Sequence, residues 1–259
     1  IGTANLQGLT TSQIAGLSAT QLGVMTSTQV QALTATQVPA LNLLNVGTSN
    51  IGSISATQAR ILTSAQLNAA SANTSVFQAI GTSNIKALQD GVVGGLSSTA
   101  LTNLASTQVK ALTALQIKEL STTQLGQLSS TQVGYLDTVQ ATALKADQIA
   151  SLESSRLQAL GTSNIAAFNA NQISALTSAQ INQLTTAQIR AIDSTDLQSL
   201  ATDRISGLNT TQLTSFSTPQ LQALNAAQVK ALRDEAINVL RGEKAARAAD
   251  VSKARENLR

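Results

Sequence analysis

The stretch LTSAQINQLTTAQIRAI, residues 176–192, states nearly the same pattern twice, eight residues apart. At this distance Leu176 is followed by Leu184, and Gln180 is followed by Gln188. Eight residues of straight α-helix rotate by about 800°, which overshoots two full turns by about 80°. A fixed apolar position would therefore spiral around one continuous helix and could not keep facing a core. The period predicts a helix that is broken once in every repeat.

The same eight-residue unit, called the octad below, extends over residues 1–232. Its consensus is L-[ST]-[ST]-x-Q-[ILV]-x-[A/x], with Gln at the fifth position in 18 of 29 octads. Phase breaks occur near residues 41–45 and near residues 71–79, and the run is unbroken from Ile80 onward. We therefore predict one repeat domain over residues 1–232 rather than a set of globular domains.

The second position of the octad carries a helix-starting signal. It is Ser, Thr, Asn or Asp in 19 of 29 octads, three residues before the usual Gln. This spacing is the capping box, in which the hydroxyl accepts from a backbone N–H and the Gln side chain reaches back to the cap residue. In the opening stretch, Thr177 and Thr185 should begin two helices, and Gln180 and Gln188 should complete their caps.

Such short helices are not stable alone, so successive octads must stack and share a core. The sequence predicts an all-α, elongated solenoid with one short capped helix per octad, apolar core residues at positions one and six, and Ala frequent at position eight. A β-solenoid is the alternative, because Thr and Val favour strands. Ala, Gln and Leu favour the helix, and apolar spacings of five and three do not fit the alternation of a strand.

Four octads depart from the consensus and read Gly-Thr-[Ser/Ala]-Asn, beginning at Gly2, Gly47, Gly81 and Gly161. We expect tighter corners there, in which Gly relieves backbone strain and Asn takes the place of the capping Gln.

Residues 233–259 differ in composition from the octads, because they contain 12 charged residues and almost no Ser or Thr. We predict a longer amphipathic helix over this segment, which either caps the open end of the solenoid or docks a further subunit.

The composition removes much of catalytic chemistry, since the chain has no Cys and no His. Thiolate nucleophiles, imidazole bases and Cys/His zinc sites are therefore excluded. The remaining candidates are carboxylates, and each has a structural explanation. Asp137 and Asp193 stand at N-cap positions, Asp147 and Asp203 fall in first helical turns, and Asp196 replaces the fifth-position Gln. We predict no catalytic, cofactor-binding or metal-binding residue, and no enzyme.

The charge distribution and the motifs also indicate that the chain does not bind nucleic acid. The formal net charge is +3, and residues 1–232 carry nine basic and eight acidic side chains, which leaves no phosphate-neutralising stripe. The fragment LTATQV, residues 33–38, resembles the opening of the DNA-reading repeats of TAL effectors. The much longer period of those repeats, with its base-reading residue pair, is absent. No run of 18 apolar residues is present, so no transmembrane helix is expected.

Tandem units such as LSTTQLGQLSSTQVGYL, residues 120–136, resemble the Ser/Thr/Gln/Ala-rich repeat regions of large bacterial secreted and cell-surface proteins, adhesins and fibres among them. The resemblance covers about residues 1–232 and implies an extracellular or bacterial cell-surface location. It implies a non-enzymatic structural protein, either a filament or surface-layer subunit or an adhesin stalk.

We expect the partners to be copies of the same chain, packed head to tail or laterally, with no cofactor. The alternative is a binding module whose Ser/Thr/Gln surface ladder contacts polysaccharide, ice or a host surface. Because the chain begins at Ile1 and not at Met, we also expect it to be processed or a fragment of a longer protein.

Overall fold

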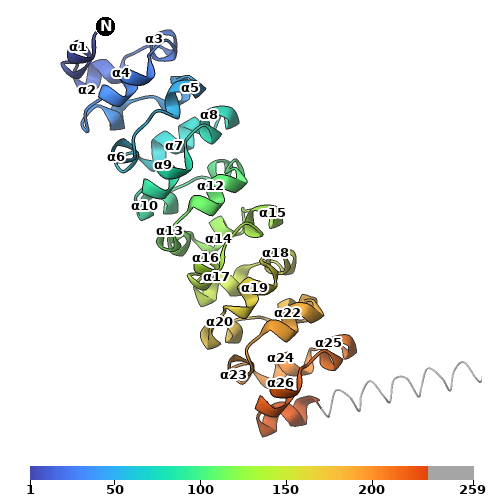
Figure 1. Ribbon diagram of the computed structural model, residues 1–259. Helices are drawn as coiled ribbons and strands as arrows, with labels where there is room; N and C mark the ends of the chain where they lie inside the picture. The colour runs from blue at the N-terminus through green and yellow to red at the C-terminus, as the bar shows by residue number, and fades with distance from the viewer. Residues whose placement is uncertain (233–259) are drawn as a thin grey trace, which may run out of the picture. The chain divides into compact units, whose positions relative to one another are not determined.

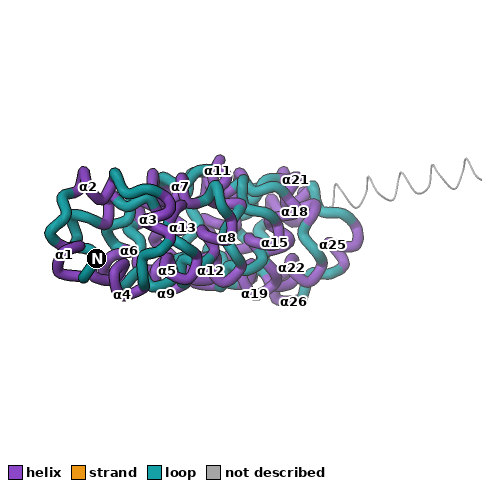
Figure 2. Tube along the Cα trace, turned by 90° about the horizontal axis from the view of Figure 1, so that it is seen from above, coloured by secondary structure: helices purple, strands orange, loops and turns teal. Residues whose placement is uncertain are grey.

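The computed structural model describes residues 1–232. Two compact units divide the chain, Ile1–Leu160 and Gly161–Arg259, and the second is described as far as residue 232. Helices and loops alternate throughout the described part, which contains no strand (Figure 2). The all-α solenoid prediction is confirmed and the β-solenoid alternative is wrong. The charged helix predicted for residues 233–259 lies outside the described residues.

In unit 1 the chain forms short helices joined by short corners (Figure 1). Their bounds are α1 (Thr3–Gln7), α2 (Thr11–Ala15), α3 (Ala19–Gly23), α4 (Ser27–Ala32), η1 (Val38–Ala40), η2 (Leu43–Asn45), α5 (Thr48–Ile51), α6 (Ala56–Ala59), α7 (Ser64–Ala70), α8 (Thr74–Gln78), α9 (Thr82–Ala87), α10 (Asp90–Gly94), α11 (Ser98–Thr102), α12 (Ser106–Ala111), α13 (Ala114–Glu119), α14 (Thr122–Leu125), α15 (Ser130–Val133), α16 (Thr138–Thr142), α17 (Ala146–Ser151) and α18 (Ser154–Ala159).

Unit 2 is built in the same way, and residues 226–232 at its described end are also helical. Its bounded helices are α19 (Gly161–Ala166), α20 (Ala170–Ser174), α21 (Ser178–Gln183), α22 (Thr186–Ala191), α23 (Ser194–Leu197), α24 (Thr202–Ser206), α25 (Thr210–Thr214) and α26 (Thr218–Ala223).

Most helices begin where the capping box predicts. Thr177 accepts from the backbone N–H of Gln180 at 3.2 Å, and the Gln180 side chain accepts from the Thr177 N–H at 2.8 Å. The cap residue is in extended backbone, with φ −78° and ψ 160°, so the chain turns a corner before each helix. The complete box is present at the starts of α2, α3, α4, α6, α7, α13, α14, α15, α16, α20, α21, α22, α25 and α26.

The core is formed by the first and sixth positions of the octad, as predicted. In the middle of unit 1, Leu112 at position one and Ile117 at position six are 3% and 0% exposed. The side chains at position one and position six point toward opposite neighbours in the stack of turns. In the first octads position one is open, with Ile1 77% exposed, and in the last described octads position six is open, with Leu221 48% exposed. Position one is therefore covered by the preceding turn and position six by the following turn.

The first phase break replaces one octad with five residues, 41–45. The chain around this break folds into two 3-10 helices, η1 and η2, and Pro39 lies in the first turn of η1. A 3-10 helix rises faster per residue than an α-helix, so fewer residues span a similar path. Leu41, Leu43 and Val46 stay buried, which shows that the core continues through the shortened repeat.

The four Gly-Thr octads only partly match the expectation. Gly161 has a φ of +79°, in the left-handed region that Gly tolerates best, and it lies at the boundary between the units. Gly2, Gly47 and Gly81 have φ of −68°, −55° and −62°, so backbone relief is the wrong explanation there. The helices that follow these three glycines begin without a side-chain cap.

Candidate functional site

The fifth-position Gln binds two parts of the structure at once. In α16, the Gln140 side-chain oxygen accepts from the backbone N–H of Asp137 at 2.9 Å, which completes the local cap. Its Nε2 group donates to the carbonyls of Val109 and Leu112, at 3.0 and 2.6 Å. The side chain is 2% exposed, so one buried amide joins a helix start to the preceding turn of the solenoid.

This arrangement recurs along the chain and is called the amide ladder below: fifth-position amides that donate to backbone carbonyls one turn earlier. In regular octads the acceptors lie 31 and 28 residues earlier, at position six and at the next position one, at distances of 2.6–3.1 Å. One turn of the solenoid therefore holds between three and four octads. Glutamines that make both bonds are Gln37, Gln108, Gln116, Gln132, Gln140, Gln148, Gln212, Gln220 and Gln228.

The ladder satisfies groups that would otherwise be costly to bury. The position-six carbonyl of Val109 already accepts from the Leu112 N–H at 3.2 Å, and the amide adds a second bond to it. The position-one carbonyl of Leu112 follows the helix end and is bound by the amide, and an unpaired buried carbonyl costs about 1–3 kcal/mol. Among the described residues, no buried side-chain nitrogen or oxygen lacks a hydrogen-bond partner. Stacking of turns thus depends on polar bonds as well as on apolar packing.

Sequence reasoning missed this second role of Gln, although the sequence contains a signal for it. A capping box accepts Glu as readily as Gln. Glu never occurs at the fifth position of an octad, whereas Gln or Asn is usual there. The absence of Glu indicates that the N–H₂ end is favoured at this position. The expected Ser/Thr/Gln surface ladder is accordingly wrong for the fifth-position Gln inside the stack, because burial between turns removes these side chains from the surface.

Other residue types replace Gln in part. Asn84 donates to the carbonyl of Ile54 at 2.7 Å but makes no cap, because its side chain is one methylene shorter. The expectation that Asn replaces the capping Gln is therefore wrong for Asn84: it keeps the bond between turns and loses the local one. Arg156 donates through Nε to the Leu128 carbonyl at 2.6 Å and pairs with Glu153 at 2.7 Å.

The carboxylates singled out from the sequence occupy the predicted helix starts. Asp137 caps α16 and accepts from the Gln140 N–H at 2.8 Å, and Asp193 caps α23 and accepts from the Thr195 N–H at 2.8 Å. Asp147 lies in the first turn of α17. Asp203 lies in the first turn of α24. Both N-cap predictions are confirmed.

Asp193 and Asp196 have opposite electrostatic environments. Hydrogen bonds from the Thr195 hydroxyl and backbone N–H hold the pKa of Asp193 below its ordinary value. Burial, and then the negative charge of Asp193, raise the pKa of Asp196. Asp196 stands at a fifth position, where an amide donor is usual and where a carboxylate has no proton to donate at neutral pH.

Hydroxyl groups line the outer surface of the solenoid. In unit 2 a groove is lined by residues that include Thr186, Thr210 and Thr211 at helix starts, with Asn209 beside them. Asn209 accepts from the Gln212 N–H as a cap, at 2.9 Å. Within residues 1–232, no group of three His, Cys, Asp or Glu side chains is placed to hold a metal ion. None of the described helices has the length and apolar character needed to cross a membrane.

Tyr135 and the three Phe residues fill space at the core or beside it. Phe77, Phe168 and Phe216 are buried, at 0%, 2% and 8% exposure. Tyr135 is half-buried, and the Lys110 ammonium lies 5.2 Å from the centre of its ring. A cation at this distance is weakly attracted by the ring.

Comparison with known families gives one match. The family model of the ALTTAQ repeat matches residues 1–35 and 149–186, one segment beginning in each half of the chain. No curated protein matches the sequence. The matched segments contain the capped octads described above, and they are similar to this repeat family. The match and the recurring geometry together support a tandem-repeat protein with an all-α solenoid fold.

Proposed function

We propose that the chain is a non-enzymatic structural protein that associates with copies of itself, as a filament or surface-layer subunit or as the stalk of an adhesin. The observation that carries the proposal is the repetition of one contact between turns, in which buried amides donate to carbonyls. A structure made of identical stacked contacts lengthens by repetition, which suits a spacer or a fibre.

The surface supports close packing of copies. Residues 1–59 contain no Asp, Glu, Lys or Arg, so a long part of unit 1 has no charged side chain to repel a neighbour. Small uncharged hydroxyls keep such a surface hydrated. We place the protein outside the cell, at a bacterial surface, on the resemblance of its repeats to secreted repeat regions.

Sedimentation of the full chain over a hundredfold concentration range, together with electron microscopy, tests self-association. We expect concentration-dependent oligomers or filaments. A strictly monomeric chain over the whole range would remove the self-association part of the proposal. Protease treatment of intact source cells tests the location, since a surface protein is degraded while a cytoplasmic control protein is not.

The second candidate function is a binding module, which the hydroxyl-lined groove of unit 2 favours. Hydroxyls of Thr186, Thr210 and Thr211 could donate to and accept from an extended polysaccharide. Retention of the chain on a glycan array, with loss of retention in a Thr210→Val/Thr211→Val double variant, would promote this function. Unchanged retention in the double variant would remove the groove from it.

A further inference from the structure

Three basic side chains of unit 1 stand in one column on the surface, and we call them the cation column. Arg60 is the C-cap of α6, Lys86 lies in the last turn of α9, and Lys110 lies in the last turn of α12. All three occupy position seven of their octads and are exposed. Because α6 packs beside α9 and α9 packs beside α12, the three cations follow one another along unit 1 (Figure 1).

Two consecutive grooves connect the members of the cation column. One groove is lined by Arg60, Lys86 and the corner 87–90, and it measures about 350 Å³. The other is lined by Lys86, Lys110, the corner 111–114 and residues at the start of α16, and it measures about 310 Å³. Lys86 borders both grooves, so they form one continuous path past all three cations.

The charged groups of the column are available to a ligand. Among residues 1–232 an ion pair joins Arg156 to Glu153, and none of the three column cations pairs with a described carboxylate. The Lys110 ammonium lies over the Tyr135 ring, 5.2 Å from its centre. This contact with the face of a ring leaves the N–H donors of the ammonium free to bind oxygen atoms.

The helix dipole explains the octad position of these cations but not their alignment. A basic side chain in the last turn of a helix is favoured by the partial negative charge there. Position seven accordingly also holds the exposed Lys118 and Arg190. Neither of these two lines the grooves of the column. The placement of three cations on successive turns, beside the same two grooves, therefore needs a further explanation.

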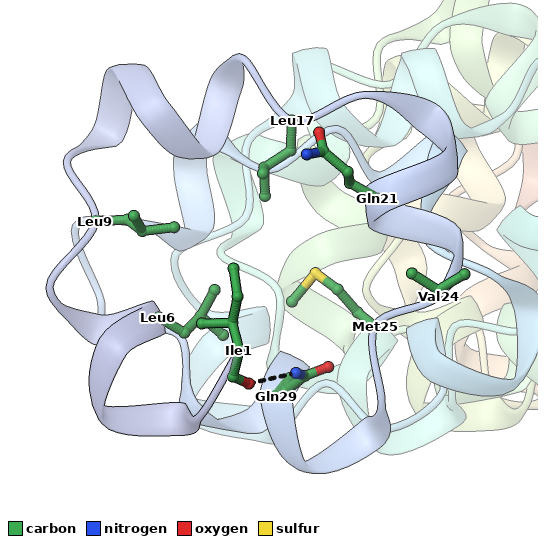
Figure 3. Close-up of a pocket in the computed structure, with 8 residues that line it drawn as sticks. All are labelled: Ile1, Leu6, Leu9, Leu17, Gln21, Val24, Met25 and Gln29. Atoms are coloured by element: carbon green, nitrogen blue, oxygen red, sulfur yellow. Dashed lines mark hydrogen bonds between the residues drawn. The ribbon is translucent and has the colours of Figure 1, made fainter.

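A hollow elsewhere in unit 1 shows that cations are not a general feature of depressions in this fold. In Figure 3, Leu6, Leu17 and Met25 converge on that hollow, with Gln21 at its rim. No charged side chain lines it, and residues 1–59 contain none. The two grooves of the cation column differ from it in charge, although the octads that form them are built in the same way.

The chemistry of the grooves indicates an extended and sparsely charged anion. Packed helices lie about 8–10 Å apart, so the negative groups of a ligand along the column should recur at about that interval. Asp90 and Asp137 also line the grooves, and Thr113 adds a hydroxyl. These two carboxylates would repel a nucleic acid, which carries a phosphate at every residue, but they accept hydrogen bonds from hydroxyl groups. A linear polysaccharide in which acidic sugars alternate with neutral sugars meets both conditions.

We propose that the cation column binds an extended acidic polysaccharide, with sugar carboxylates at the three cations and sugar hydroxyls at Asp90 and Asp137. The proposal rests on the second candidate function, the binding module, and names its ligand class and a site separate from the hydroxyl-lined groove of unit 2. It does not depend on self-association.

The test removes the three positive charges from the full chain. The probe is immobilised hyaluronate, in which glucuronate alternates with N-acetylglucosamine. We expect the unchanged chain to bind, and the dissociation constant of an Arg60→Gln/Lys86→Gln/Lys110→Gln variant to rise about tenfold or more. Binding by the unchanged chain should also weaken when the salt concentration rises from about 0.05 M to about 0.5 M.

The matched control is a Lys118→Gln/Arg190→Gln/Lys230→Gln variant. It removes the same charge from exposed residues at the same octad position, and none of them lines either groove. This variant should bind hyaluronate like the unchanged chain. Circular dichroism melting curves should coincide for both variants, which separates a lost site from a lost fold.

Equal losses in the two variants would mean that net charge alone governs binding, and would overturn the column as a site. Tighter binding to phosphatidylglycerol vesicles or to single-stranded DNA than to hyaluronate would overturn the polysaccharide as the ligand. Hyaluronate binding that is lost in the Thr210→Val/Thr211→Val variant but kept in the column variant would move the site to unit 2. A chain that does not bind hyaluronate would overturn the proposal and leave the filament proposal, which sedimentation tests, unaffected.

Discussion

The regular octads from Ile80 to Leu160 and the irregular stretch of residues 38–79 reach the same contacts with different chain lengths. In the regular part, Gln116 donates to carbonyls 31 and 28 residues back, Ile85 and Leu88. After the five-residue repeat, Gln58 donates to Val30 and Leu33, only 28 and 25 residues back. Those acceptors still occupy position six and the following position one.

The comparison shows what is held constant in this fold. One repeat is three residues shorter, and the Gln58 amide accordingly donates to carbonyls three residues nearer in the sequence than the Gln116 amide does. The acceptor carbonyls still occupy the same octad positions. The same holds for the longer second break, after which Asn84 reaches the position-one carbonyl of Ile54, 30 residues back. The amide ladder therefore fixes the register between turns, and the length of a corner is free to vary.

The largest effect should come from removing one ladder amide in each region. A Gln116→Leu variant leaves two groups unpaired, the Thr113 N–H and the buried Leu88 carbonyl, and removes one of the two hydrogen bonds to the Ile85 carbonyl. We therefore expect a loss of about 2 kcal/mol or more in the free energy of unfolding. Gln58→Leu should cost a similar amount. Urea denaturation followed by circular dichroism measures both losses.

The exposed Gln89 gives the control, and Gln89→Leu should change the free energy of unfolding by no more than about 0.5 kcal/mol. A loss for Gln58→Leu that is well below that for Gln116→Leu would contradict the equivalence of the two regions. It would indicate that the irregular stretch is held by its apolar contacts alone.

The sequence is sufficient to predict the local structure here and insufficient for the contacts between turns. A capping box lies within four residues, so Thr177 and Gln180 predict a helix start without knowledge of the fold. The Gln116 amide in α13 donates to the Leu88 carbonyl, 28 residues earlier. Nothing in the local sequence specifies that separation. Avoidance of Glu at the fifth position was the available signal, and it indicates a donor without naming the acceptor. The carboxylate caps, Asp137 and Asp193, were predictable for the same local reason.

An intermediate effect is expected where the two regions meet. A Cβ added at Gly95, which follows α10, would lie 2.8 Å from both Cβ and Oγ of Ser64 in α7. Gly95→Ala should therefore cost about 1–3 kcal/mol, as overpacking does. Gly91, in the same octad, has no atom within 4 Å of such a Cβ. Gly91→Ala should stabilise the helix by about 0.5–1 kcal/mol.

The matched pair is read from thermal melting curves, and a Ser64→Gly change in the Gly95→Ala background should recover part of the loss. If Gly95→Ala melts at the same temperature as the unchanged chain, the two regions are not in close contact at this point.

The smallest effect should come from Asp196, where the regular repeats of unit 2 hold a carboxylate in place of the ladder amide. Its carboxylate accepts a hydrogen bond from the backbone of Ala170. Asp196→Asn would supply a donor comparable to Asn84 and remove the repulsion from Asp193, so we expect a gain of about 0.5–1 kcal/mol at pH 7. Asp203→Asn, which removes a favourable charge from the first turn of α24, should instead cost about 0.3–1 kcal/mol.

The pH dependence of this gain has a definite sign. Because the pKa of Asp196 is raised in the folded protein, its stabilising form is the protonated one, which is complete below the ordinary value of 3.8 and is lost as pH rises through the folded pKa. The advantage of Asp196→Asn should therefore be largest at neutral pH, should shrink as the pH falls through the folded pKa toward 3.8, and should stay constant below that value. Melting curves of both chains between pH 3 and pH 7 measure the difference. An advantage that grows toward low pH would mean that Asp196 is stabilised as a carboxylate, and that the amide ladder tolerates an acceptor where the rest of the chain places a donor.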